Sequence, residues 1–168
     1  MGEALIVWTI RLSMLCFFAS LIAWSGPFDT RRFERPMRVV WTIGFVLLVF
    51  HVASAFHFHH NWSHLRALEE TARETRQMIG FDFGSGVYFN YLFTVIWGFD
   101  VAGMWMIPLA LERRLSQIRL VWMTYLMFIA FCGTAVFETG WMRAFGISAL
   151  VILIVGVADK NRISTRRV

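Results

Sequence analysis

Apolar stretches and short polar connectors alternate along the whole chain. A bilayer hydrocarbon core is roughly 30 Å thick, and an α-helix needs about 20 apolar residues to cross it. Five stretches approach or exceed this length, at about residues 4–25, 39–59, 87–111, 120–137 and 141–158. The pattern predicts an all-α integral membrane protein. Residues 1–168 form a single domain in this interpretation, a bundle of about five transmembrane helices.

Residues 60–86 interrupt the apolar pattern between the second and third stretches. They carry too many charges to cross a membrane, and opposite charges such as Glu69 and Arg73 lie one helical turn apart. We therefore expect an amphipathic or surface helix in this segment. Whether it continues the second span as one helix is left open by the sequence. The basic tail, residues 159–168, is expected to be frayed.

The basic residues predict how the chain is oriented. Arginine or lysine is concentrated in the connector after the first span, in the connector after the third span and in the C-terminal tail. The N-terminus, the histidine segment and the turn at Glu138 show no such excess. With five spans these two sets fall on opposite sides. Because basic connectors stay in the cytoplasm, the N-terminus and histidine segment are predicted outside and the C-terminus in the cytoplasm.

Composition supports a membrane location and argues against other partners. Hydrophobic residues make up 58% of the chain, more than a soluble domain of this size can bury. The net charge of +5 comes from clusters between apolar runs, so lipid and not nucleic acid is the expected partner. Cys16 and Cys132 lie inside apolar runs and suggest no disulfide framework. The first apolar stretch lacks a cleavage signal and is expected to be retained.

The histidines are the main candidate for chemistry. Four of the five lie between residues 57 and 64, and His51 lies just upstream. On one continuous helix His57, His60 and His64 share a face, and Glu74 continues it. Imidazole nitrogens with a carboxylate suit a transition metal such as zinc, copper or iron. The sequence thus predicts a metal site with these four ligands, with Asp82 as a further carboxylate. If Asn61 or Ser63 caps a new helix, the shared face is broken.

The histidine pattern can be compared with the ligands of membrane di-iron enzymes and with the axial ligands of heme. Integral-membrane di-iron hydroxylases and desaturases use several histidine boxes, but here the third to fifth spans supply no histidine. Heme is less favoured than a metal ion, because a bis-histidine site needs histidine on two helices. Histidine–methionine ligation stays open, and the available methionines are Met104, Met106, Met123 and Met127.

Six polar side chains inside or beside the predicted spans form a second candidate set, because such groups are costly in a membrane and normally have partners. They are Arg11, His51, Asn90, Tyr91, Asp100 and Glu138. At 1.5 Å per residue, Arg11 and His51 lie at similar depths. We expect these two to line one cavity with Asn90, Tyr91 and Glu138. Asp100 lies deeper, where it is expected either to hydrogen-bond with Thr124 or Tyr125 or to serve helix packing.

Three functions follow from these features. The first is a metal-binding membrane protein, and whether it is an enzyme is left open because no catalytic residues can be assigned. The second is a non-catalytic subunit or homo-oligomer that packs through small residues, namely Gly98, Ala102, Gly103, Gly133 and Ala135. The third is a transporter or proton pathway that uses Arg11, His51 and Asp100.

Overall fold

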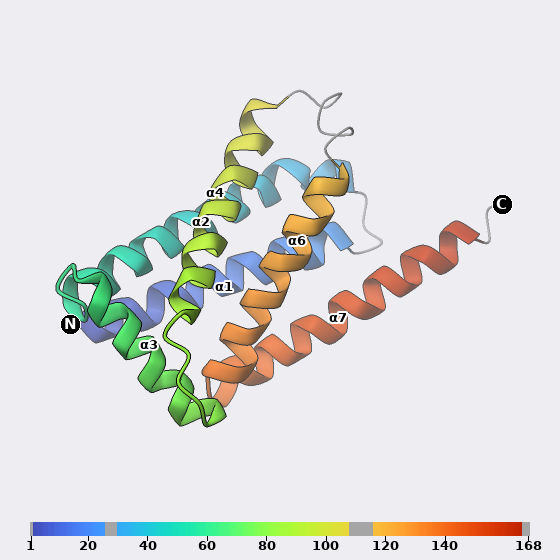
Figure 1. Cartoon of the computed structure of the whole chain (residues 1–168). Helices are drawn as coiled ribbons and strands as arrows, with labels where there is room; N and C mark the ends of the chain where they lie inside the picture. Colours follow the sequence, from blue (N-terminus) through green and yellow to red (C-terminus); the bar gives the residue numbers. More distant parts are fainter. Residues whose placement is uncertain (1, 26–29, 108–115, 166–168) are drawn as a thin grey trace.

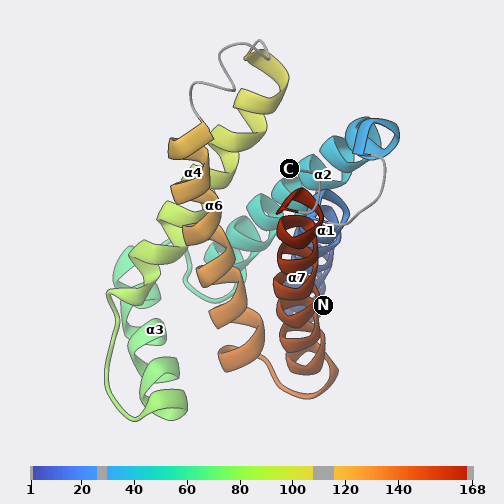
Figure 2. The same cartoon turned by 90° about the vertical axis from the view of Figure 1, so that its right-hand side faces the viewer.

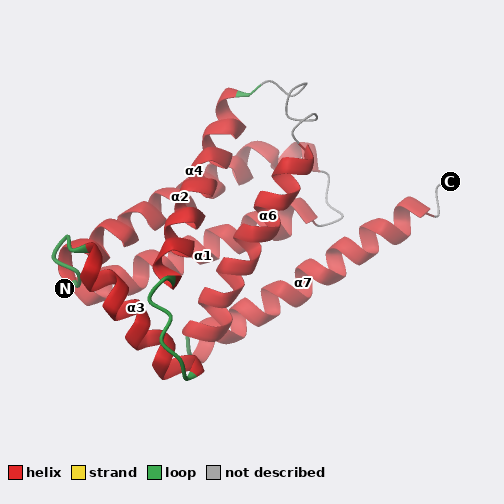
Figure 3. Ribbon diagram, viewed as in Figure 1, coloured by secondary structure: helices red, strands yellow, loops and turns green. Residues whose placement is uncertain are grey.

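The computed structural model describes residues 2–25, 30–107 and 116–165. All regular elements within these ranges are helical (Figure 3). They are α1 (Gly2–Ser25), α2 (Thr30–Phe58), α3 (His64–Ile79), α4 (Gly86–Met106), α6 (Ser116–Phe131), the π-helix η1 (Cys132–Phe137) and α7 (Gly140–Thr165). The predicted end of the third span at residue 111 and the last three residues of the basic tail lie outside the described ranges.

The five long helices run between two opposite ends of the molecule (Figure 1). One end, at the left and lower edges of Figure 1, holds the N-terminus, the α2–α3 turn and the η1–α7 junction. The other end holds the C-terminal end of α4, the start of α6 and the C-terminus. The short helix α3 lies crosswise over the first end, and Figure 2 shows α4 with α6 on one side and α7 with α1 on the other.

Three helices in the described part of the chain are long and apolar enough to cross a membrane, by length and composition. They are Gly2–Ser25, Arg35–Phe58 and Gln117–Phe137. Helix α4 has 21 residues but includes Asn90 and Asp100, and the apolar part of α7, Gly140–Gly156, is shorter. The structure thus supports an all-helical membrane protein, while the count of five spans stays a prediction.

The break between α2 and α3 settles whether the surface segment continues the second span. Helix α2 ends at Phe58, and the chain then turns through Asn61 and Trp62, whose φ angles are +46° and +59°. Such angles are outside the helical region for ordinary residues. Ser63 then caps α3, and its side chain accepts a hydrogen bond from the Arg66 amide. The surface helix predicted in residues 60–86 therefore exists as a separate element.

Other helices begin or end at different residues from the predicted spans, at the end of the bundle where α2 and α6 begin. We call this end the basic end, because the basic connectors lead into these two helices. Helix α2 begins at Thr30, well inside the first connector, and contains Pro36. Helix α4 ends at Met106 because Ile107 precedes a proline and is extended, with φ −93° and ψ 129°. Helix α7 continues to Thr165, so the tail predicted to be frayed is largely helical. Charged residues mark where a helix leaves the membrane, but the helix can continue beyond that point. The hydrophobic pattern therefore predicts the ends of the span and not the ends of the helix.

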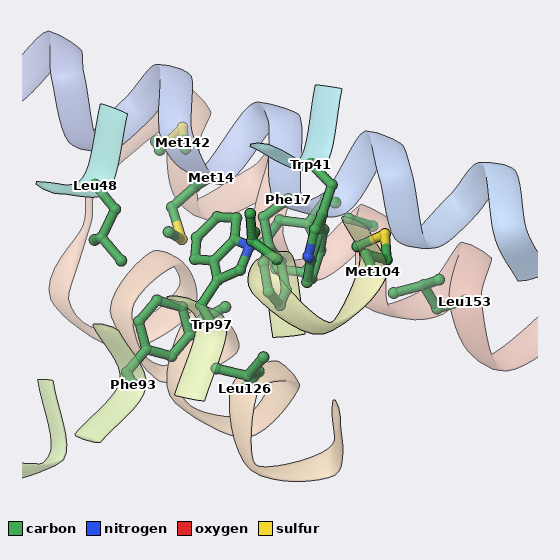
Figure 4. Packing of buried hydrophobic residues seen from close by; sticks show 14 residues of the cluster. Met14, Phe17, Trp41, Leu48, Phe93, Trp97, Met104, Leu126, Met142 and Leu153 are labelled. Atoms are coloured by element: carbon green, nitrogen blue, oxygen red, sulfur yellow. The ribbon is translucent and has the colours of Figure 1, made fainter. Parts of the chain in front are cut away.

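Aromatic rings from three helices fill the centre of the bundle (Figure 4). Phe17 of α1 stacks on Trp41 of α2 at 5.0 Å between ring centroids, and Trp97 of α4 lies 5.1 Å from Phe17 and 4.9 Å from Trp41. All three side chains are fully buried. Helices α6 and α7 close the cluster with buried aliphatic and methionine side chains, namely Leu126, Met142 and Leu153.

Small residues let helices approach closely at two places. Between α1 and α2, the Ser13 hydroxyl donates to the Gly44 carbonyl at 2.8 Å, and a methyl group at Gly44 would lie 2.9 Å from the Cys16 Cβ. Between η1 and α7, a methyl group at Gly146 would lie only 2.4 Å from the Thr134 Oγ1. Close backbone approach of this kind is a main source of helix association in membranes.

Gly146→Ala should therefore destabilise the bundle by about 1–3 kcal/mol, because the new methyl group forces α7 away from η1. Gly156→Ala, on the same helix, is the matched control, since a methyl group there would meet no described neighbour closer than the Ser25 carbonyl oxygen at 3.6 Å. Unfolding free energies measured in mixed micelles check this prediction. Equal effects of the two substitutions would contradict the close contact.

Candidate functional site

His64 forms a polar cluster with two tyrosines at the end of the bundle that α3 covers. Its Nδ1 lies 3.0 Å from the Tyr91 hydroxyl and its Nε2 lies 3.1 Å from the Tyr88 hydroxyl. A neutral imidazole has one donor and one acceptor nitrogen. One hydroxyl therefore accepts a hydrogen bond and the other donates one. The cluster joins the first residue of α3 to the first two turns of α4.

The structure does not bring the predicted metal ligands together. His57 belongs to α2 and His64 to α3, with the left-handed turn at Asn61 and Trp62 between them. His57 and His60 pack against aromatic rings, Phe58 at 4.7 Å and Phe56 at 5.4 Å between centroids. Within the described ranges, no group of three or more His, Cys, Asp or Glu side chains could hold a metal ion.

Charges on α3 pair within the helix and with the loop that follows it. Arg76 forms a bidentate ion pair with Asp82, and Arg73 pairs with Glu70. The hydrogen bond from Arg76 lowers the pKa of Asp82, so this carboxylate stays ionised. Partial desolvation, followed by the nearby charge of Glu70, raises the pKa of Glu74. The bidentate contact ties the α3–α4 loop to α3 and occupies the Asp82 carboxylate.

Arg11 and Glu138 form an ion pair between α1 and the junction of η1 with α7. Arg11 donates through Nε to Oε1 of Glu138 at 3.2 Å and through Nη2 to Oε2 at 2.9 Å. The guanidinium lies between the rings of Trp8 and Trp141, 6.0 Å and 5.7 Å from their centroids. Both charged side chains are 23% exposed. The paired geometry accounts for an arginine within a predicted span without requiring a ligand.

Arg11→Ala should lower the unfolding free energy by about 1 kcal/mol, because it removes a half-buried bidentate pair and two cation–π contacts. Arg11→Lys is the informative control, since lysine keeps the charge but cannot form the planar bidentate contact. A double-mutant cycle with Glu138→Gln measures the coupling. Strictly additive effects would show that the two side chains do not interact.

Of the five residues predicted to share a cavity, Arg11 and Glu138 pair with each other, whereas His51 and Tyr91 have other partners. His51 Nδ1 donates to the Ile6 carbonyl of α1 at 2.9 Å, which joins α1 to α2 independently of Arg11. Tyr91 bonds to His64, and Asn90 is exposed on α4. Similar depth does not bring side chains together, because each one points away from its own helix in a different direction.

Asp100 is the most deeply buried charged side chain in the described residues, with 6% of its surface exposed. Its Oδ2 accepts from the indole N–H of Trp41 at 3.0 Å, and its Oδ1 accepts from Nε of Arg119 at 3.0 Å. The partners predicted for Asp100 were wrong. Thr124 donates to the Leu120 carbonyl and Tyr125 to the Phe89 carbonyl.

Sequence reasoning missed the three partners that complete these polar contacts, namely Trp41, Tyr88 and Arg119. Trp41 is fully buried, and nothing in the apolar pattern marks it as a hydrogen-bond donor to Asp100. Arg119 lies at the edge of the basic connector predicted after the third span, but it belongs to α6. The need for a partner at Asp100 was visible in the sequence, but nothing in the spacing of residues 41, 100 and 119 identified it.

Two open, largely apolar hollows lie on the surface of the described residues. One lies along α6, lined by Leu120, Val121, Thr124, Tyr125 and Phe128, and another lies along α2 from Phe45 to Ala53. Neither hollow is lined by the histidines or by the buried charged residues.

Comparison with protein-family models, with curated proteins and with solved structures gave no match to the chain.

Proposed function

We propose that the chain is a membrane protein with five spans that serves as a packing subunit of a larger membrane assembly. The observation that carries the proposal is the way its polar groups are used. Asp100, Arg11 and His51 all bind groups on neighbouring helices of the same chain, and aromatic rings fill the space between them. Side chains used in this way stabilise a bundle.

The arrangement of helix ends supports five spans. The two ends of the bundle separate the basic connectors from the N-terminus and α3 (Figure 1). Arg35, Arg38 and Arg119 lie at the basic end, as the positive-inside rule requires of a cytoplasmic face. In the proposed topology α4 crosses the membrane although it contains Asp100, because this carboxylate is buried against Trp41 and Arg119.

Open glycine positions support lateral packing. A methyl group at Gly133 would meet no atom within 4 Å, and one at Gly103 would meet only Ile107 of the same segment. Two of the small residues predicted to permit close packing, Gly103 and Gly133, therefore lie on surfaces that no other described helix covers. Helices of a second membrane protein chain can approach closely at such positions.

Native mass in lipid nanodiscs tests the proposal. We expect the protein to form complexes larger than its 19.5 kDa monomer. Single cysteines at Gly133 should form cross-links between chains in a background without Cys16 and Cys132. A single cysteine at Val151, an exposed residue of α7, provides the comparison and should form fewer cross-links than one at Gly133. A monodisperse monomer without cross-links at Gly133 would contradict the proposal.

The metal site and the proton pathway stay predictions from the sequence. Elemental analysis of protein purified without a histidine tag tests the first one. Stoichiometric zinc, copper or iron that is lost on replacing His57, His60 and His64 would establish it. Flux across liposomes that depends on Asp100 and His51 would establish the second one.

A further inference from the structure

Helix α3 divides into a charged side and an apolar side. At about 100° per residue, its six arginine and glutamate side chains fall within one half of the helix. The other half holds Leu65, Ala67, Leu68, Ala72, Met78 and Ile79, with Thr71 and Thr75. A charged face opposite an apolar face, on a helix with few apolar residues overall, is typical of helices that lie in a membrane interface.

The centre of the apolar side packs against the loop and the first turn of α4. Ala67 and Thr75 are buried, and the Thr75 hydroxyl accepts a hydrogen bond from the Phe83 amide at 3.0 Å. A methyl group at Gly84 would lie 2.7 Å from the Leu68 carbonyl oxygen, so the loop passes very close to α3. These contacts fix the rotation of α3, with its apolar side turned toward the bundle.

Large apolar side chains remain uncovered at the margins of this contact. Trp62, Leu65 and Phe81 are 68%, 64% and 57% exposed. Met78, Ile79 and Phe83 are also exposed. We call these six residues the α3 margin. Phe83 lies 6.1 Å from Phe89 between ring centroids, so the margin continues onto the exposed face of α4.

We propose that the α3 margin is embedded in the outer leaflet of the bilayer, at the boundary between headgroups and acyl chains. The inference rests on the proposed five spans, because α3 lies across one end of the bundle (Figure 1) and its apolar side packs toward the loop that leads into α4. Trp62 and the two phenylalanines lie at the headgroup level, where aromatic side chains are favoured. The charged side of α3 faces water.

The charge of α3 determines how the lipid surface is held. Arg66, Arg73 and Arg76 balance Glu69, Glu70 and Glu74, so the formal charge of these groups is zero. A neutral helix gains nothing from anionic lipids, which attract basic segments by about 1 kcal/mol per Lys or Arg. The α3 margin is therefore held by the lipid surface through apolar contact alone, in zwitterionic and anionic leaflets alike.

Spin labels at single cysteines in phosphatidylcholine nanodiscs test the inference, with Cys16 and Cys132 replaced. Labels at Leu65 and Phe81 should collide several-fold more with oxygen than with a water-soluble nickel chelate. Labels at Glu69 and Arg73, on the charged side, should show the opposite preference. Adding phosphatidylglycerol should leave the depth at Leu65 unchanged.

Two results would overturn the inference. Preference for the nickel chelate at Leu65 and Phe81 would place the margin in water, and shielding from both reagents would mean that a protein partner covers it. A label at Val46, an exposed residue of α2, separates these results from a failure of the proposed spans. If Val46 is exposed to lipid and the margin is not, only the inference about α3 fails.

Discussion

Replacing Asp100 with alanine should destabilise the bundle by about 3 kcal/mol, the largest effect that we expect from a single polar substitution. The carboxylate is buried and accepts hydrogen bonds from Trp41 and Arg119. Its removal leaves a buried indole N–H and a guanidinium without this acceptor. Equilibrium unfolding in mixed micelles or steric trapping in nanodiscs measures the change.

Two further variants separate charge from hydrogen bonding at this position. Asp100→Asn keeps an oxygen that can accept from the Trp41 indole but loses the charge that pairs with Arg119, so it should cost less than Asp100→Ala. Trp41→Phe removes the indole donor and keeps an aromatic ring in the core. Equal losses in Asp100→Asn and Asp100→Ala would show that the ion pair, and not the bond to Trp41, provides the stability.

Phe17→Ala should destabilise the bundle by about 2 kcal/mol or more, because it empties the position around which the other rings pack. Phe17 is fully buried and contacts Phe18, Trp41, Phe93 and Trp97. In a bilayer the loss comes from packing, since lipid chains solvate an apolar side chain as well as the protein interior does.

Phe99→Ala is the matched control for this prediction, because Phe99 is 63% exposed and points away from the core. The same measurement should find a small change for it. Should Phe99→Ala cost as much as Phe17→Ala, the aromatic cluster would not be the centre of the bundle.

Hydrophobic length predicted the helices well, because it reports directly on what a membrane requires. The first span, predicted at about residues 4–25, corresponds to α1 at Gly2–Ser25, and the fourth corresponds to α6 with η1. The pattern predicted that the second span begins at about residue 39 and the fifth ends at about residue 158, whereas α2 begins at Thr30 and α7 ends at Thr165. Helices can continue into water beyond the membrane, and hydropathy does not record that continuation.

The histidine prediction depended on one helix continuing through residues 57–64. The signals against continuity were local and present in the sequence, since Asn61 tolerates a left-handed conformation and Ser63 is a good N-cap. The structure uses both of them. Once α2 and α3 are separate helices, the spacing of His57, His60 and His64 no longer places their rings on one face.

The partners of Asp100 could not be predicted from spacing. Trp41, Asp100 and Arg119 lie on three different helices. Depth calculations place side chains along the membrane normal, but the direction in which each helix faces depends on packing contacts such as Ser13 with Gly44. Those contacts become known only when the helices are assembled.

The most direct test of the proposed topology is the accessibility of three single cysteines in intact cells, with Cys16 and Cys132 replaced by serine. The positions are Asn61 in the α2–α3 turn, Gln117 at the start of α6 and Thr139 before α7, all exposed. A membrane-impermeant maleimide should label Asn61 and Thr139 from outside, and Gln117 only after the membrane is opened. Labelling of Asn61 and Gln117 from the same side would show that α4 does not cross the bilayer and would contradict the five-span account.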